Sequence, residues 1–401
     1  MSFVLNLWKE KREMGDTKCN KDGWVKKKLG EVCEIIMGQS PSSESYNYEE
    51  NGLPFFQGCS DFGLLYPNEK VYCSSPNKIA EAKDVLISVR APVGTLNIAN
   101  KHCCIGRGLA AIRCDNSSMN YKFIYYFLEA TRPILEMLGT GAVFKSINKK
   151  QLNEHRIEVP SYKKQIAIVS ELDCLNGIIE KQKEQLKQLD ELAQSIFYDM
   201  FGDPVENEKG WNKKKFKEFG TIISGYAFQS GSFVEEGIPV LKIGNINSGQ
   251  LSLENVSYYM EDKSLTKYEV YPNDMVISLT GTVGKDDYGN VCILPNTCQK
   301  YYLNQRNAKL VTDKDCEILF LKFLFKDYKV KNELTRNSRG VRQANISNKD
   351  IYDLLLILPP LPLQQAFASK IEAIEHQKEL IKKSIAETET LFNSRMDYYF
   401  G

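Results

Sequence analysis

The segment Gly23-Trp24-Val25-Lys26-Lys27-Lys28-Leu29 returns later in the chain as Gly210-Trp211-Asn212-Lys213-Lys214-Lys215-Phe216. Other segments recur in the same order: Asp84 to Ser88 as Asp274 to Ser278, Ile147 as Ile346, Gln165 as Gln365, and Ser195 to Gly202 as Ser394 to Gly401. The separation of the partners grows slowly, from 187 positions (23 to 210) to 199 (202 to 401). Chance similarities would not keep this order, so the chain is a tandem duplication with halves of about 190 residues.

Each half begins with a part rich in glycine, aromatic and β-branched residues, at 23–160 and 205–358. Short apolar runs bounded by turns, such as Asp84 to Val89 and Val276 to Leu279, predict strands. Two longer apolar stretches, Asn120 to Met137 and Ile318 to Leu334, predict helices. The expected fold class is therefore α+β, with two similar mixed α/β domains related by pseudo-twofold symmetry.

Each half ends in a long predicted helix, at 161–204 and 359–401. Apolar residues spaced by three and four form one stripe on each helix. The first stripe contains Leu172, Leu175, Ile179, Leu186, Leu189 and Ile196, and the second contains Phe367, Ile371, Ile374, Ile381, Ile385 and Phe392. Stripes of this length are typical of coiled coils, and the duplication would make the pair antiparallel. The competing interpretation is that each helix packs on its own domain.

Polar side chains interrupt both stripes near their middles, at Gln182 and Lys378. Such residues can set the register of a coiled coil at some cost in stability. The first helix would be ~58 Å long at 1.5 Å per residue, and we expect it to hold the two domains apart.

Composition is ordinary for a globular protein: of 401 residues, 42% are hydrophobic and 26% charged, with a net charge of +1. We expect a cytoplasmic protein, because no apolar run approaches the ~20 residues of a membrane helix and residues 1–22 lack the pattern of a signal peptide. This N-terminal extension suggests no function. The eleven cysteines form no CxxC pair, so we expect reduced thiols and no metal.

No catalytic motif emerges from the sequence. The GxxxxGK[ST], GxSxG and HExxH patterns are absent, as is the signature of an amino-methyltransferase. Glu81-Ala82-Lys83 has the spacing of a nuclease fragment, but a solvated charge pair explains it better. We therefore expect a chain without catalytic activity.

Polar and basic residues instead gather in turns at matching places of the two halves. In the first half they are Gln39, Ser40, Gln57, Arg90, Arg107, Lys145 and Ser146; in the second they are Gln229, Lys242, Asn245, Thr280, Lys285, Arg306, Arg339, Arg342, Gln343 and Asn345. Arg matches guanine, Asn and Gln match adenine, and Lys, Ser and Thr suit phosphates. The competing interpretation is ordinary loop polarity. Because the grouping occurs twice, we favour contact with DNA.

The order of these features resembles the specificity subunit of type I restriction–modification systems. The resemblance covers residues 23–401 and rests on duplicated, individually weak motifs. They are the Gly-Trp pairs at 23–24 and 210–211, the runs Asp84 to Gly94 and Asp274 to Gly284, the stretch Gly237 to Ile246, and Met200 to Pro204 after the first helix.

The resemblance implies two target-recognition domains, each reading one half of a split sequence in double-stranded DNA. It also implies two DNA methyltransferase subunits along the helices, and restriction subunits with motor and nuclease activity. This chain would hold no cofactor, since S-adenosylmethionine would bind the methyltransferase partner. Two alternatives remain open: a structural adaptor that binds protein, and a DNA-modifying enzyme with unrecognised motifs.

Overall fold

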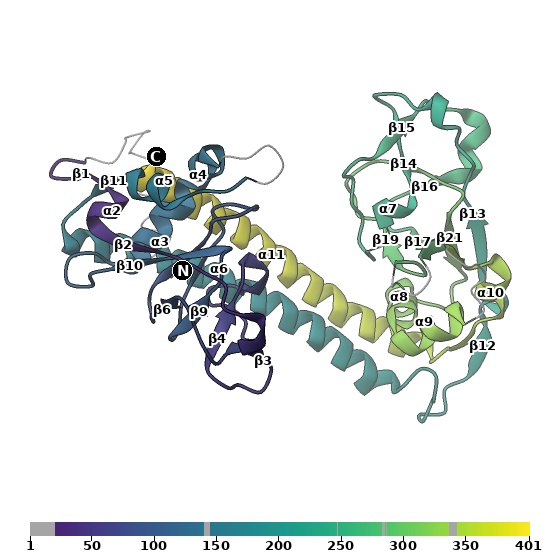
Figure 1. Ribbon diagram of the computed structural model, residues 1–401. Helices are drawn as coiled ribbons and strands as arrows, with labels where there is room; N and C mark the ends of the chain where they lie inside the picture. The colour runs from purple at the N-terminus through teal and green to yellow at the C-terminus, as the bar shows by residue number, and fades with distance from the viewer. Residues whose placement is uncertain (1–20, 140–144, 247, 283–284, 286, 337–342) are drawn as a thin grey trace. The chain divides into compact units, whose positions relative to one another are not determined.

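The computed structural model describes residues 21–139, 145–246, 248–282, 285, 287–336 and 343–401 (Figure 1). They form two compact units: unit 1 comprises the residues up to Lys183 together with Lys382–Gly401, and unit 2 comprises Glu184–Ile381. Each unit therefore contains part of each long helix. The domain boundaries expected from the sequence instead place the helices, at 161–204 and 359–401, outside the two domains. Within the described residues, no helix is long and apolar enough to cross a membrane.

Unit 1 contains two sheets and a short ribbon. The first sheet is antiparallel and has the order β2 (Cys33–Met37), β10 (Leu109–Cys114), β7 (Val85–Ser88), β8 (Leu96–Ile98). The second has the order β3 (Tyr46–Asn47), β5 (Tyr72–Cys73), β4 (Leu53–Phe56), β9 (Cys103–Ile105), β6 (Ile79–Ala80), with β4 and β9 parallel. The ribbon pairs β1 (Val25–Lys28) with β11 (Arg156–Val159). All four residues of β7 are buried, because one sheet face meets helix α3 (Tyr121–Ala130) and the other a second apolar cluster.

Unit 2 repeats this arrangement. Its first sheet has the order β13 (Gly220–Ser224), β21 (Asn307–Thr312), β17 (Met275–Ser278), β19 (Val291–Ile293), and its second has β15 (Ser257–Tyr259), β14 (Ile238–Leu241), β20 (Tyr301–Leu303), β16 (Glu269–Val270). The ribbon pairs β12 (Lys213–Lys215) with β23 (Leu355–Ile357), and β18 (Thr280–Thr282) pairs with β22 (Gln343–Asn345). The common strand order confirms the tandem duplication and the α+β class.

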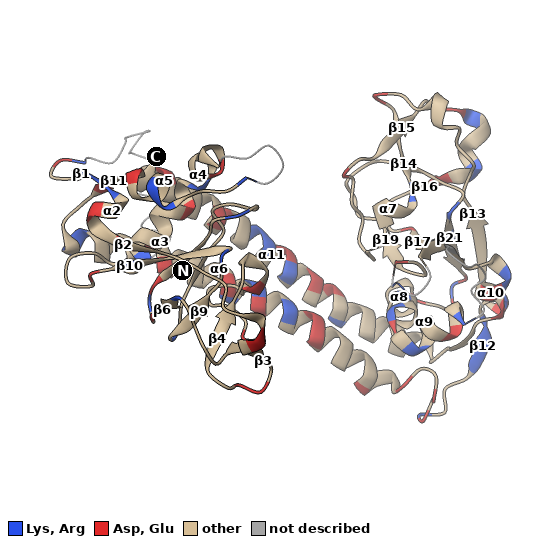
Figure 2. Cartoon of the chain, in the orientation of Figure 1, with Lys and Arg blue, Asp and Glu red and all other residues tan. Residues whose placement is uncertain are grey.

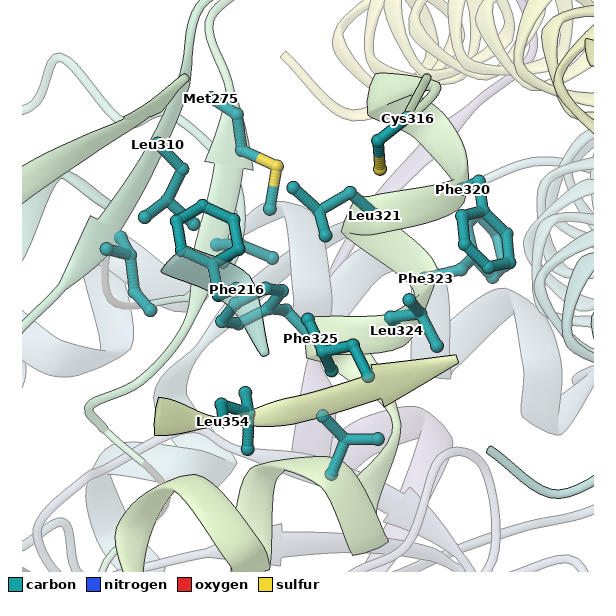
Figure 3. Packing of buried hydrophobic residues seen from close by; sticks show 14 of the residues in the cluster. Phe216, Met275, Leu310, Cys316, Phe320, Leu321, Phe323, Leu324, Phe325 and Leu354 are labelled. Atoms are coloured by element: carbon teal, nitrogen blue, oxygen red, sulfur yellow. The ribbon is translucent and has the colours of Figure 1, made fainter. Parts of the chain in front are cut away.

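The predicted helical stretch of each half is broken into two helices. In unit 1, α3 is followed by α4 (Arg132–Leu138), and in unit 2, α8 (Ile318–Lys326) is followed by α9 (Tyr328–Thr335). Pro133 lies in the first turn of α4, where its missing N–H is tolerated but where it would break a continuing helix. The Asp327 carboxylate accepts the N–H groups of Lys329 and Val330, so it caps α9. Figure 3 shows α8 placing Phe320, Leu321 and Leu324 in the core of unit 2.

The remaining helices are short except for two. The short ones are α2 (Leu29–Val32), α5 (Lys149–Glu154), α7 (Ile243–Ile246) and α10 (Asn348–Asp353). The long helices α6 (Tyr162–Phe201) and α11 (Leu361–Phe400) have 40 residues each.

Pairing of α6 with α11 is visible within each unit. In unit 1, Glu171 binds Arg395, and Gln182 Nε2 donates to Ser384 Oγ at 2.7 Å. Partners thus fall along α11 as they rise along α6, so the two segments are antiparallel. In unit 2, Lys378 Nζ lies 2.7 Å from Asp190.

The twelve predicted stripe residues are all buried or half-buried. Leu172 also belongs to the domain core of unit 1, and Phe367, Ile371 and Ile374 to that of unit 2. Both interpretations of the stripes therefore hold in part, since each helix packs on a domain as well as on the other helix. A coiled coil along the whole length stays a prediction.

One match between the halves needs correction. Gln165 is fully buried; its amide accepts the N–H of Asn120 and donates to the carbonyls of Ser118 and Pro160. In unit 2 the same three bonds are made by Gln364, with Glu317, Asp315 and Pro359. The partner of Gln165 is thus Gln364, and Gln365, chosen from the sequence, is exposed.

Candidate nucleic-acid interface

Three segments of unit 1 that carry predicted contact residues lie side by side. The Val89 N–H donates to the Gly108 carbonyl at 2.9 Å, and the Ile147 N–H donates to the Val89 carbonyl at 3.0 Å. One residue further along, Arg90 pairs with Ser146 in an antiparallel bridge. The end of β7 therefore lies between the β9–β10 turn and the segment before α5.

Unit 2 builds the same arrangement with the same bonds. The Leu279 N–H donates to the Arg306 carbonyl at 2.9 Å, and the Ile346 N–H donates to the Leu279 carbonyl at 2.8 Å. Thr280 pairs with Asn345 in the ribbon of β18 and β22. We call these segments the loop platform: residues 88–90, 106–108 and 145–147 in unit 1, and 278–282, 304–307 and 343–346 in unit 2.

A fourth segment follows the first strand of each main sheet. In unit 1 the Gln39 N–H donates to the Ile105 carbonyl, and in unit 2 the Tyr226 N–H donates to the Leu303 carbonyl. Tyr226 therefore takes the place of Gln39, and Gln229, which the sequence comparison selected, lies three residues beyond. Gln57 and Lys242 do correspond, because Phe56 pairs with Ile105 as Leu241 pairs with Leu303.

The cations of the unit 1 platform are available for a ligand. Arg90, Arg107 and Lys145 are exposed, and none of them forms an ion pair with a described residue. Ser146 and Gln39 are also exposed. By contrast, Arg113 in the sheet is bound by Asp84, Nη2 to Oδ2 at 2.8 Å, and this contact raises the pKa of the guanidinium. Arg113 is thus structural, whereas the unit 1 platform cations have no carboxylate partner among the described residues.

Unit 2 offers fewer free cations in its described part. Arg306 and Lys285 are exposed without an ion pair to a described residue, and Gln229 and Asn345 are exposed. Lys242 is half-buried; its Nζ donates to Ser257 Oγ at 2.6 Å and lies 4.1 Å from the centre of the Phe233 ring. Gln343 is placed by its backbone in β22, and Arg339 and Arg342 lie outside the described residues.

Two predicted contact residues have structural roles instead. Asn245 is 4% exposed; its Oδ1 accepts the Lys242 N–H at 2.9 Å and its Nδ2 donates to the Ser252 carbonyl at 2.9 Å. Thr280 is 6% exposed, and its hydroxyl donates to Asn345 Oδ1 at 3.1 Å. Burial and satisfied hydrogen bonds leave these side chains holding loops, so both expectations are corrected.

The structure also adds residues that the sequence comparison passed over. Gln305 and Tyr226 are exposed beside Arg306, and the Gln305 N–H donates to the Tyr226 carbonyl at 2.8 Å. In unit 1 the Asn77 amide donates to the Ser40 carbonyl at 3.3 Å. The sequence could have indicated Gln305, because it lies next to the predicted contact residue Arg306. It could not have indicated Asn77, which is 37 positions from Ser40 in the chain.

Charge is distributed differently over the long helices. Figure 2 shows positions of basic residues (blue) and acidic residues (red) intermixed along α6 and α11. Lys183, for example, lies 3.4 Å from Glu180 and 3.6 Å from Glu389. A net charge of +1 is therefore compatible with unmatched cations on the platform.

Cysteine and metal chemistry find little support at the platform. Burial raises the pKa of both Cys103 and Cys104 to about 12, so these side chains remain thiols and serve packing. Over the part of the chain that the structure describes, no group of three His, Cys, Asp or Glu side chains is placed to hold a metal ion.

The duplicated fold and the duplicated platform define a tandem α+β protein in which both units build the same backbone arrangement of loops. The sequence model of the type I restriction modification DNA specificity domain matches residues 21–189 and 208–390, and the chain belongs to this family. The family expected from the sequence is thereby confirmed.

Individual relatives agree with this membership. The putative type I restriction enzyme MjaX specificity subunit of Methanocaldococcus jannaschii is 41% identical over 189 residues, 47% of this chain and 44% of that protein. The MjaVIII specificity subunit of the same organism is 24% identical over 418 residues, 97% of this chain and 95% of that protein. The solved type I restriction–modification S subunit from M. genitalium has the same fold, with a TM-score of 0.59 at 16% identity, over 97% of this chain and 98% of that one.

Proposed function

We propose that the chain is a specificity subunit that reads a bipartite target in double-stranded DNA, one half with each unit. The observation that carries this proposal is the loop platform, built twice by the same backbone hydrogen bonds and bearing exposed cations that form no ion pair with a described carboxylate. Arg107 and Arg306 occupy the same turn in the two units, and their guanidinium groups suit guanine edges or phosphates. Family membership supports the same function.

The proposal assigns catalysis to partner subunits. Two DNA methyltransferase subunits would bind along the long helices, where Ile166, Leu192 and Leu380 are exposed apolar side chains. S-adenosylmethionine would bind the methyltransferase subunits, and restriction subunits would join the same assembly. This chain would supply DNA recognition alone. We expect it to act in the cytoplasm.

Methylome sequencing of cells with and without the gene tests this function. We expect a methylated motif in two specified halves, separated by unspecified bases, that disappears when the gene is deleted. The chain together with its methyltransferase partner should bind a duplex carrying the motif. A methylome unchanged by the deletion, with no DNA binding by the complex, would contradict the proposal. Methyl transfer by the isolated chain would instead identify an enzyme.

A further inference from the structure

Gln57 in unit 1 is exposed, yet its side chain is held in one place. Ser40 Oγ accepts a hydrogen bond from Gln57 Nε2 at 3.0 Å and lies 3.1 Å from Gln57 Oε1. The same hydroxyl accepts the Arg107 N–H at 3.2 Å, and the Gln57 N–H donates to Asp61 Oδ2 at 2.7 Å. A single serine thus ties the glutamine amide to the β9–β10 turn of the platform.

Glycines make room for this arrangement. A Cβ at Gly106 would lie 2.5 Å from Gln57 Oε1, and a Cβ at Gly108 would lie 2.5 Å from the Gln57 carbonyl oxygen. Any larger residue at either position would therefore displace Gln57. An exposed amide held in this way has already lost rotamer freedom, so it loses less on binding a ligand.

A recess of about 400 Å³ opens beside the amide. Tyr46, Phe55 and Val71 form an apolar part of its wall, whereas Gln57, Asp61 and Lys70 belong to the polar and charged remainder. The Tyr46 and Phe55 rings stack with their centres 4.6 Å apart, and the Tyr46 hydroxyl donates to the Pro41 carbonyl at 3.0 Å. The site therefore combines an oriented amide with a recess that has one apolar wall, formed by Tyr46, Phe55 and Val71.

One base pair matches this combination. In the major groove an A·T pair presents the adenine N7 acceptor and N6 donor, which a glutamine amide complements, and the methyl group of thymine, which favours apolar contact. We propose that unit 1 reads an A·T pair: Ser40 positions the Gln57 amide in the free chain, the adenine takes the place of the Ser40 hydroxyl at the same Nε2 and Oε1 atoms, and the thymine methyl enters the recess beside Tyr46 and Phe55. The inference rests on the proposed function and adds the base that this site selects.

Unit 2 provides an internal contrast. Lys242 takes the place of Gln57, and its Nζ is bound by Ser257 and lies over the Phe233 ring. Unit 2 has no amide side chain at the place of Gln57. We therefore do not expect unit 2 to select an A·T pair through this position. Lys242→Ala is therefore the matched control for Gln57→Ala.

The experiment begins with the methylomes of cells expressing each full-length variant with its partner subunits. Gln57→Ala should turn one specified A·T pair of one half-site into an unspecified position and leave the other half unchanged. Lys242→Ala should leave that A·T pair specified. Ser40→Ala should relax the same pair less completely. In the Gln57→Ala background it should cause no further relaxation at that pair, because a positioning residue acts there through Gln57.

Duplexes with altered bases separate the two contacts. With the wild-type complex, 7-deazaadenine at the assigned adenine removes N7 and should weaken binding by about twofold to tenfold, the effect of losing one of the two hydrogen bonds. Deoxyuridine in place of the paired thymine should weaken binding about threefold to fourfold, the effect of one buried methyl group. For the Gln57→Ala complex the 7-deazaadenine effect should vanish.

The possible outcomes are distinct. If the Gln57→Ala complex binds and methylates the wild-type motif with every position still specified, the A·T inference is wrong while the proposed function stands. An undiminished 7-deazaadenine effect in Gln57→Ala would also overturn it. If the wild-type complex directs no methylation and binds no DNA, both the proposed function and the inference are wrong.

Discussion

Neighbouring glutamines in α11 have opposite roles. The Gln364 amide binds three backbone groups and is fully buried, whereas Gln365 is exposed. Gln364→Ala leaves the Glu317 N–H and two carbonyls without that partner, so we expect a loss of about 1–3 kcal/mol in the free energy of unfolding. Gln365→Ala should change it by less than about 0.5 kcal/mol. Urea unfolding measures both variants, and equal losses would contradict the assignment.

Arg306 and Lys300 provide a matched pair of cations in unit 2. Arg306 is exposed and forms no ion pair with a described residue, whereas Lys300 lies 2.6 Å from Glu261 and 2.9 Å from Glu269. Arg306→Ala should weaken DNA binding by ~1–3 kcal/mol and relax one position if it reads a base, or lower the salt slope if it binds a phosphate. Lys300→Ala should do neither. Titration of the complex at several salt concentrations measures this; unchanged binding by Arg306→Ala would exclude its contact.

His155 gives unit 1 a dependence on pH. Its ring is 7% exposed, Nε2 lies 3.0 Å from Thr131 Oγ1, and burial lowers its pKa from the ordinary 6.5. The unfolded chain therefore binds the proton more readily, so this contribution to stability is complete above pH 6.5 and declines below it. Urea unfolding between pH 8 and pH 5 (roughly the range in which His titrates) should show the decline. His155→Gln should remove it and His102→Gln, at an exposed position, should not; the same slope in both variants would contradict this origin.

Single residues show which features of the candidate site could be predicted from the sequence. Gln57 and Lys242 could be matched because the strands that precede them are paired alike. The sequence selected both Gln39 and Gln229, but only backbone hydrogen bonds reveal that Tyr226 occupies the place of Gln39. Burial of Asn245 was not predictable either, since its partner Ser252 lies in an irregular loop. Positions in strands that recur in both halves could therefore be predicted from the sequence, whereas the geometry of the loops could not.

At the scale of elements, the long helices were predicted well and the medium helices less well. Apolar spacing identified α6 and α11 because forty residues repeat the signal many times. The breaks at Thr131 and Asp327 depend on one proline and one capping carboxylate, and apolar spacing continues across both. One proline and one capping carboxylate thus each split a predicted helix in two, although the apolar spacing had predicted a single helix in each half.

The helices are expected to set the unread spacer of the target. Inserting four residues between Gln182 and Gln188 would lengthen α6 by ~6 Å and rotate the following residues by roughly 40°. We expect the spacer of the methylated motif to lengthen by one or two base pairs, about 3.4 Å each, while both half-site sequences stay the same. Lys187→Ala in the same segment should leave the spacer unaltered. An active insertion variant with the original spacer would show that α6 does not set the distance.

At the scale of the whole molecule, duplication predicts two independent readers. Replacing residues 23–160 by the corresponding domain of another family member should change one half of the methylated motif and leave the other. The new domain must still accept Leu172 and Met396, which this chain contributes to the core of unit 1. Methylome sequencing measures the result, and a change in both halves would contradict independent reading.

The composition of the unit 1 core has a consequence for synthesis on the ribosome. Met396 and Tyr399 pack in that core with Phe123 and Leu172, so the core is completed only by residues that are translated after the whole of unit 2. Unit 2 is continuous from Glu184 to Ile381 and has all its residues earlier. The usual order, in which the N-terminal domain folds first, is therefore reversed. A nascent chain must carry an unfinished first domain until Met396 and Tyr399 have been translated, and this interval is when chaperones would have most to bind.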